Sequence, residues 1–283
     1  MPVHEDGAQR ASFQRSRRLT AFALVATLLV GLGALATPSP VAAASIKVVI
    51  VVGPVGSSTN DYRDSAREYA RIARAYGAKV VELYTPYATW SRVKQVAQGA
   101  NLLIYLGHGN GYPSPYGAFS KYTRNGMGLN KEVSTSNSNV KYWGEYYMDR
   151  DLQLAPNAVV ILNRLCYASG NSEWGHANPT KSTAIQRVDG YGAGFLRSGA
   201  RAVFAHAIES ARYTMWALFR SERTMDSIFM AHSDASGERD FYVDSTRTDG
   251  KRAHMDPPRS GKYWRSVIGD LSMKASEWRA GAS

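Results

Sequence analysis

The sequence predicts an α/β protein, a three-layer α-β-α sandwich built around a mainly parallel sheet. Apolar β-branched runs such as Ile46 to Val52 are continuous rather than alternating, as in strands buried on both faces. Segments with helical spacing alternate with these runs, which favours a parallel sheet with helices on both sides. The chain has 283 residues, of which 44% are hydrophobic and 20% charged, so it is long and apolar enough for a large core.

The first half of the fold alternates strongly between strands and helices. After the strand Ile46–Val52, Tyr62–Tyr76 has apolar residues at helical spacing, with Asn60 or Asp61 as cap and Gly77 as stop. The next predicted elements are a strand, a short helix and a third strand: Ala78–Tyr84, Trp90–Gln98 and Asn101–Gly107.

The second half starts with a loop region of about 45 residues rich in Gly, Asn, Ser and Tyr, with a hairpin signal at Asn125-Gly126. The elements predicted after this signal are a helix, a strand, a helix stopped by Gly199, a strand and a long helix: Tyr142–Asp149, Asn157–Asn163, Thr183–Ser198, Ala200–Ala207 and Glu209–Ala231. The remaining residues are polar and rich in turn signals, with a final apolar pattern.

The N-terminus has the composition of a secretory signal. Arg15, Arg17 and Arg18 precede the apolar stretch Leu19–Ala36, and small residues follow up to Ala44. We therefore expect a signal peptide at 1–44, an α/β domain at 45–231 and an extension at 232–283 that is packed on the core or partly disordered. The protein would be secreted or associated with the cell wall, without a stable membrane span once the signal is removed. An uncleaved anchor is the alternative.

The chain is strongly basic, with a net charge of +11. The signal region carries four arginines and two acids, so its removal leaves +9. Such a domain is attracted to anionic partners, and a cell-wall polymer is one candidate. The basic residues are scattered and never exceed two in a row, so we expect solvated surface and no nucleic-acid partner.

The only cysteine, Cys166, and one histidine, His108, each follow a predicted strand. Functional residues of open parallel sheets gather beyond the carboxyl ends of strands, and neighbouring strands lie about 4.8 Å apart. A cysteine beside a histidine can be held as a thiolate, the nucleophilic form. The backbone N–H groups of Gly109 and Cys166 would then stabilise an oxyanion.

Simpler interpretations exist for both residues. Cys166 would be a small core residue and His108 a hydrogen-bonded structural histidine. His206, which ends another strand, is a rival partner for Cys166. His108, Cys166, His176 and His206 show no recurring ligand spacing, so we expect no metal and no other cofactor.

Around these two residues the chain resembles the caspase-like cysteine peptidases, which include caspases, metacaspases, gingipains, separase and CHAT domains. The resemblance, nearest to CHAT and gingipain-type domains, covers about Ile46 to Ala231. It rests on LLIYLGHG (Leu102–Gly109), on AVVILNRLC (Ala158–Cys166) and on the later GAGFLRSGARAVFAHA (Gly192–Ala207). The chain departs from the caspase pattern at Arg164-Leu165, where caspases have Gln-Ala, and at Ala168, where they have Gly.

The resemblance implies a caspase-like fold, cleavage of peptide bonds by a dyad of His108 and Cys166, and an oxyanion hole from the amides of Gly109 and Cys166. Arg164 would select an acidic substrate residue, and Glu173 or Asp189 a basic one; the sequence does not choose between them. The function predicted is a secreted caspase-like cysteine endopeptidase.

Two alternatives remain open. The first is a non-catalytic exported surface-binding protein of the same fold. The second is a peptidase that stays latent until the segment from Gly111 to Asn157 is cut. Aromatic residues in and near that segment would line a groove for a peptide or a sugar, or simply pack beneath the loop: Tyr112, Tyr116, Phe119, Tyr122, Tyr142, Trp143, Tyr146 and Tyr147.

Overall fold

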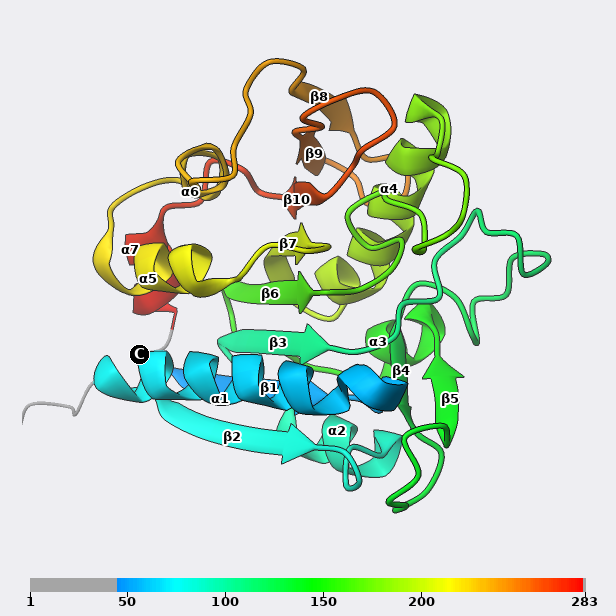
Figure 1. The fold of residues 1–283 in the computed structure, drawn as a ribbon. Helices are drawn as coiled ribbons and strands as arrows, with labels where there is room; N and C mark the ends of the chain where they lie inside the picture. Colours follow the sequence, from blue (N-terminus) through cyan, green and yellow to red (C-terminus); the bar gives the residue numbers. More distant parts are fainter. Residues whose placement is uncertain (1–44, 282–283) are drawn as a thin grey trace, which may run out of the picture. The chain divides into compact units, whose positions relative to one another are not determined.

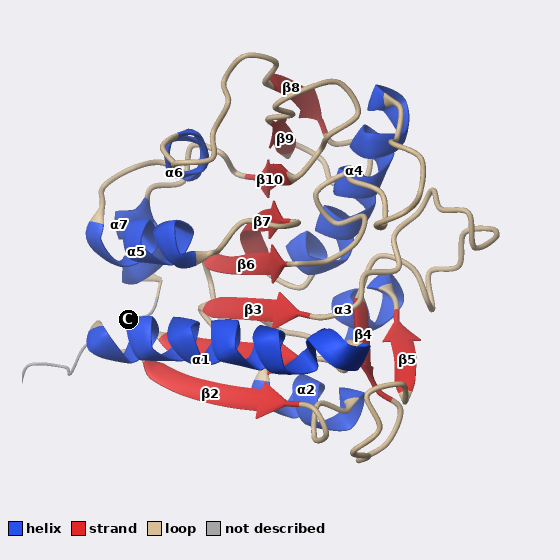
Figure 2. Cartoon of the chain, viewed as in Figure 1, coloured by secondary structure: helices blue, strands red, loops and turns tan. Residues whose placement is uncertain are grey.

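The computed structural model describes residues 45–281, and the expected signal peptide at 1–44 lies outside this range. Its main sheet has the strand order β2-β1-β3-β6-β7-β10-β9-β8, and β4 and β5 form a separate hairpin (Figures 1 and 2). The first five strands of this order are parallel, and β10, β9 and β8 complete the sheet in antiparallel pairing. The strands are β1 (Lys47–Val52), β2 (Lys79–Tyr84), β3 (Leu102–Leu106), β4 (Met127–Asn130), β5 (Val140–Trp143), β6 (Ala158–Asn163), β7 (Ala200–His206), β8 (Phe241–Asp244), β9 (Arg252–Met255) and β10 (Arg265–Gly269).

Helices cover both faces of the sheet, because the central strands are apolar on both sides. Alternate residues of β1, β3 and β6 belong to two different hydrophobic clusters, one on each face. One face is covered by α2 (Trp90–Val96), α3 (Glu145–Asp151) and α4 (Lys181–Arg197). The other is covered by α1 (Thr59–Ala75), α5 (Arg212–Arg220), α6 (Met225–Met230) and α7 (Ala275–Ala280). The predicted fold class, a three-layer sandwich with a mainly parallel sheet, is confirmed.

The five predicted strands are all present, with ends shifted by one residue at most. The sequence signal is strong for β1, β3, β6 and β7, because a strand buried on both faces requires a continuous apolar run. The edge strand β2 is only partly buried. The helices α1, α2 and α4 also lie where their spacing predicts them.

The predicted long helix Glu209–Ala231 is wrong. The chain forms α5 and α6, separated by an extended segment in which Thr224 caps α6 by accepting a hydrogen bond from the N–H of Ser227. Hydrogen bonds to a distant segment stabilise the break. The N–H of Met225 donates to the carbonyl of Met273, and the N–H of Ala275 donates to the carbonyl of Arg223. Pairing with a segment about 50 residues away therefore overrides the local helical pattern.

The residues after Ala231 supply strands of the main sheet and one of the helices that cover it, so they are more than an extension packed on the core. β10 pairs with β7 inside the main sheet, and Trp278 of α7 is fully buried with its indole N–H donating to the carbonyl of Asn101. The sheet thus continues past Ala231, where the sequence placed the end of the α/β domain. None of the helices within 45–281 has both the length and the apolarity needed to cross a bilayer.

The loop region between β3 and β6 contains the β4-β5 hairpin and α3. Asn125 has the left-handed backbone that its Asn-Gly signal predicts, with φ of 62°, but it precedes β4 and does not form the hairpin turn. The helix expected at Tyr142–Asp149 starts later, at Glu145, because Val140–Trp143 pairs as β5.

Candidate functional site

The segments after β3 and β6 continue side by side beyond the strands. Paired residues of the two strands differ by 57 in number, from Leu102 with Val159 to Leu106 with Asn163. The same offset relates Gly109 to Cys166. A Cβ atom built on Gly109 would lie far inside 3.0 Å of the Cys166 carbonyl oxygen, so the two backbones touch there. His108 and Cys166 are therefore brought to one edge of the sheet, as the sequence predicts.

Cys166 lies in a turn with unusual backbone geometry. Arg164 has a φ of 61° and Tyr167 a φ of 70°, both in the left-handed region that residues other than glycine rarely adopt. Such conformations cost of order 1 kcal/mol each and gather at functional sites. The turn is stabilised by the N–H of Arg164, which donates to the carbonyl of His206, and by the burial of the Tyr167 ring.

His108 is anchored by its backbone. Its carbonyl accepts hydrogen bonds from the Tyr105 hydroxyl (3.1 Å) and from the N–H of Gly128 (3.3 Å). The half-buried ring forms no hydrogen bond with any residue in the range 45–281, and this includes the thiol of Cys166. It lines a cavity of about 490 Å³ with Gly109, Asn110, Tyr142 and other residues, and the ring is thus accessible to a bound molecule.

The two amides proposed for the oxyanion hole point to no acceptor in the described part of the chain. Within residues 45–281, neither the N–H of Gly109 nor that of Cys166 donates a hydrogen bond, whereas the next N–H, of Asn110, donates to the Tyr191 hydroxyl at 2.7 Å. Two free donors beside a thiol are what a developing oxyanion requires.

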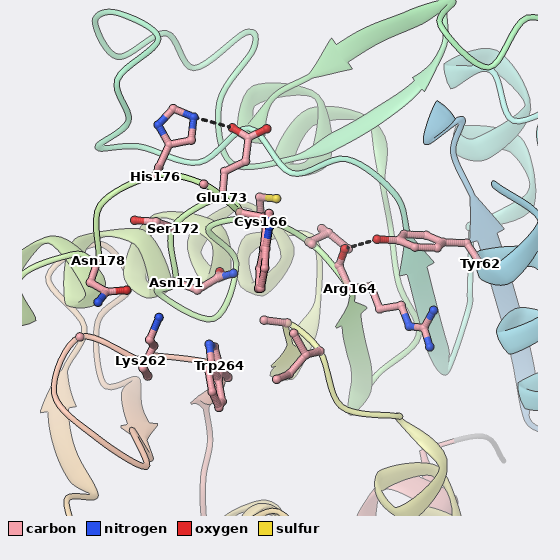
Figure 3. A pocket seen from close by; sticks show the side chains of 16 residues that line it. Tyr62, Arg164, Cys166, Asn171, Ser172, Glu173, His176, Asn178, Lys262 and Trp264 are labelled. Atoms are coloured by element: carbon pink, nitrogen blue, oxygen red, sulfur yellow. Dashed lines mark hydrogen bonds and ion pairs between the residues drawn. The ribbon is translucent and has the colours of Figure 1, made fainter. Parts of the chain in front are cut away.

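Cys166 lines a second cavity, of about 550 Å³ (Figure 3). Its walls come from four separate segments of the chain: the start of α1, the turn at Cys166 with the loop after it, the residues after β7, and the approach to β10. They include Tyr62, Arg164, Asn171, Trp174, Ile208, Lys262 and Trp264. The indole of Trp174 is 98% exposed, so this rim offers an apolar surface to a ligand.

Glu173 lies where the two cavities meet, since it lines both of them. Its Oε2 accepts hydrogen bonds from the hydroxyls of Tyr116 (2.7 Å) and Tyr167 (3.2 Å). It also lies 3.8 Å from Nε2 of His176, as Figure 3 shows. The carboxylate is thereby fixed between the imidazole cavity and the thiol cavity.

The electrostatics of the site favour a neutral pair. Burial raises the pKa of the Cys166 thiol to about 11; the charge of Glu173 acts in the same direction, and a hydrogen bond from the backbone of Trp174 opposes them. Burial lowers the pKa of His108, and Glu173 opposes this shift. At neutral pH the substrate-free site thus holds a protonated thiol and a neutral imidazole at the same edge of the sheet, in place of the thiolate suggested by the sequence.

This thiol should react slowly with alkylating agents at neutral pH. Since only the thiolate reacts, we expect the rate of iodoacetamide labelling to rise about tenfold per pH unit from pH 7 and to level off near pH 11. Cys166 is the only cysteine, so mass spectrometry of the intact chain measures its labelling directly. A rate that levels off below pH 8 would show a thiolate and contradict this assignment.

Glu173→Gln removes one negative charge near both groups. Because that charge raises both pKa values, we expect the labelling midpoint of Cys166 to move to lower pH and the pKa of His108 to fall further. Labelling against pH measures the first, and NMR titration of the imidazole the second. Glu132→Gln, on the exposed hairpin loop, changes the net charge equally and should leave both unchanged. Unchanged values in Glu173→Gln would mean that its carboxylate does not act on the pair.

Asp189 lies apart from these two cavities. It is a buried residue of α4 whose carboxylate accepts hydrogen bonds from the Ser245 hydroxyl (2.5 Å) and from both the N–H and the hydroxyl of Thr246 (3.0 and 2.7 Å). It lines a different cavity, with Tyr112, Phe119 and Arg247. The structure therefore brings Arg164 and Glu173 to the thiol and leaves Asp189 elsewhere.

His206, the rival partner, faces the opposite side of the sheet from the core that Cys166 contacts. Its ring stacks on Phe204, and its Nε2 lies 3.1 Å from the Thr214 hydroxyl of α5. No group of three or more His, Cys, Asp or Glu side chains within residues 45–281 is arranged to hold a metal ion.

Sequence reasoning missed Lys262 and Trp264, which line the thiol cavity. They lie about 100 residues after Cys166 and reach it because β10 pairs with β7, and the final apolar pattern is the one sequence signal for that strand. The aromatic residues divide between two roles. Tyr116 and Tyr142 line the His108 cavity, whereas Trp143, Tyr146 and Tyr147 pack against one another.

No family model matches the chain, and no curated protein matches it either. Two solved structures show some similarity. A short-chain flavodoxin associated with a non-canonical PDU bacterial microcompartment has a TM-score of 0.28 and 11% identity over 55% of this chain and 77% of that one. A flavodoxin of Streptococcus pneumonia TIGR4 has a TM-score of 0.29 and 15% identity over 54% and 77%. Likeness at this level identifies neither a family nor an activity.

Proposed function

We propose that this protein is an exported cysteine endopeptidase of the caspase-like type, with Cys166 as nucleophile and His108 as general base and acid. The observation that carries the proposal is the contact between the backbones of Gly109 and Cys166. It puts a thiol, an imidazole and two free N–H donors at one edge of the sheet, which is the set of groups that acyl transfer needs.

Because the Cys166 thiol and the His108 imidazole are both neutral, the thiol proton has to be transferred during the reaction. As the sulfur of Cys166 attacks the scissile carbonyl carbon, the neutral imidazole of His108 accepts the thiol proton, and the carbonyl π electrons move to the oxygen. That oxygen accepts hydrogen bonds from the N–H groups of Gly109 and Cys166. The C–N bond then breaks, the leaving amine takes the proton from His108, and a thioester remains. Water, deprotonated by His108, hydrolyses the thioester and releases the thiol.

The raised pKa of Cys166 is compatible with this order of events. A thiol with a pKa of about 11 is a weak nucleophile by itself, so its proton must leave during attack. The imidazole is suited to accept it because burial keeps the ring neutral at pH 7. A ring that is not held by hydrogen bonds can also turn toward the substrate, and catalytic contacts often tighten only when substrate binds.

A second candidate function is favoured by the same thiol. Burial and a raised pKa are also properties of an inert structural cysteine. A non-catalytic exported protein of this fold would use its basic surface to bind an anionic cell-wall polymer, and Cys166 would serve only packing.

The two functions are separated by a cleavage assay. The full-length protein is incubated with a library of internally quenched peptides, with Cys166→Ala as control. Cleavage by the wild type and none by the variant supports the endopeptidase. Equal signals from both, or no cleavage of any peptide even after the segment from Gly111 to Asn157 has been cut, rejects it and leaves the binding protein.

A further inference from the structure

The N–H of Gly109, one of the two donors assigned to the oxyanion hole, belongs to a peptide plane that is held from its other side. The carbonyl of His108 lies in the same plane, and it accepts hydrogen bonds from the hydroxyl of Tyr105 (3.1 Å) and the N–H of Gly128 (3.3 Å). The peptide bond is trans, so its C=O and N–H point in opposite directions. The N–H of Gly109 is therefore directed away from Tyr105 and β4.

The next peptide plane, between Gly109 and Asn110, is held by a second tyrosine. The N–H of Asn110 donates to the hydroxyl of Tyr191, on α4, at 2.7 Å. Tyr105 and Tyr191 are both fully buried in the same hydrophobic cluster, and burial raises the pKa of each hydroxyl, so both stay neutral. Glycine has no side chain that restricts its φ and ψ. At Gly109 the two hydroxyls, one on each side, restrict these angles instead.

The two rings have little freedom to move. The hydroxyl of Tyr105 also donates to the carbonyl of Gly128 (2.8 Å) and accepts from its N–H (2.9 Å). The neighbouring glycines make room for the rings: a Cβ on Gly107 would lie far inside 3.0 Å of the Tyr105 hydroxyl, and one on Gly111 would lie 3.0 Å from the ring of Tyr191. Each hydroxyl is thus fixed on a regular element of the fold, β3 or α4.

We infer that Tyr105 and Tyr191 are positioning residues for the N–H of Gly109. Neither tyrosine lines the thiol cavity or the imidazole cavity, and both act through the backbone of a donor that has no acceptor within residues 45–281. The inference rests on the proposed function, in which this N–H stabilises the oxyanion. A donor that is fixed in advance stabilises developing charge without first having to be ordered.

The first test measures the amide itself and does not need turnover. NMR relaxation of the full-length protein gives the order parameter of the Gly109 N–H. We expect about 0.85, a rigid backbone, in the wild type, and a fall toward about 0.6 in Tyr191→Phe and in Tyr105→Phe, which each keep the ring and lose one hydroxyl. Ser198→Ala is the matched control: it removes a buried hydroxyl that donates to the carbonyl of Phe195 (2.7 Å) at the end of α4, and should leave the order parameter unchanged.

The second test is kinetic. A loosened donor weakens the binding of the transition state and not that of the peptide. We therefore expect kcat on a quenched peptide to fall about tenfold or more in Tyr191→Phe, while KM changes by less than about twofold. A purely structural loss would lower the amount of folded protein and leave kcat per folded molecule unchanged, as expected for Ser198→Ala.

The two tests separate this inference from the proposed function. Equal order parameters at Gly109 in the wild type and Tyr191→Phe overturn the inference, whether or not peptides are cleaved. A lowered order parameter with an unchanged kcat also overturns it, and leaves the peptidase standing. If the wild type cleaves no peptide, the proposed function fails, and the order parameters alone decide whether the two hydroxyls hold the amide. If Tyr105→Phe does not fold, Tyr191→Phe gives the answer, since it removes a single hydrogen bond.

Discussion

Cys166→Ala and His108→Ala are each expected to reduce peptide cleavage by about a thousandfold or more, to the background rate. The physical reason is that nucleophile and base act as one unit, so that removing either one costs nearly as much as removing both. The measurement is kcat/KM on a quenched peptide, beside far-UV circular dichroism of the folded chain. Both side chains are only half-buried, and both residues lie outside the helices and strands of the fold, Cys166 in a turn and His108 in an isolated bridge to Gly128. We therefore expect the dichroism to stay unchanged.

Two further variants sharpen this result. Cys166→Ser keeps the shape of the side chain but replaces the sulfur with a weaker nucleophile, and should be almost as inactive as Cys166→Ala. The double variant Cys166→Ala/His108→Ala should be no worse than either single variant, because they disable the same step. Activity that survives in either single variant would show that the dyad does not carry the reaction.

Gly109→Ala is expected to lower both stability and activity. The added Cβ would overlap the carbonyl oxygen of Cys166, which is backbone and cannot rotate away. The two segments must separate, at a cost of about 1 to 3 kcal/mol of unfolding free energy. A shift near 1 Å also moves the imidazole and both N–H donors relative to the sulfur, so kcat should fall about a hundredfold. Urea unfolding gives the first quantity and peptide cleavage the second.

Gly281→Ala is the matched control for this substitution. Its Cβ would also meet a backbone carbonyl, that of Pro156, near the opposite end of β6. It should lower stability while leaving kcat of the folded protein unchanged. If Gly109→Ala behaves in the same way, the contact between Gly109 and Cys166 is structural and does not position the catalytic groups.

The sequence predicts the parallel half of the sheet well. The strands β1, β3 and β6 are buried on both faces, and such strands are visible locally as continuous apolar runs. The glycines of GHGNG are a similar local sign: a Cβ on Gly107, Gly109 or Gly111 would collide with Tyr105, Cys166 or Tyr167. The glycines recur here because neighbouring atoms pack directly against the chain at each of the three positions and leave no room for a side chain.

The helix break between α5 and α6 and the strands after Ala231 are harder to foresee. Both depend on partners far along the chain, since Met225 pairs with Met273 and β10 joins β7. Local spacing has no information about such pairing. The pairing of β10 with β7 also brings Lys262 and Trp264 to the thiol cavity, whereas Asp189 lines a separate one.

By itself, the sequence determined the three-layer architecture and the placement of His108 and Cys166 after two strands, because strand burial and glycine requirements are local properties of the chain. Only the tertiary structure decided that β3 and β6 are neighbours, and that their register continues to Gly109 and Cys166. It also decided the protonation of the thiol and the charge of its cavity. Those depend on burial and on residues from four separate segments, which no single stretch of sequence contains.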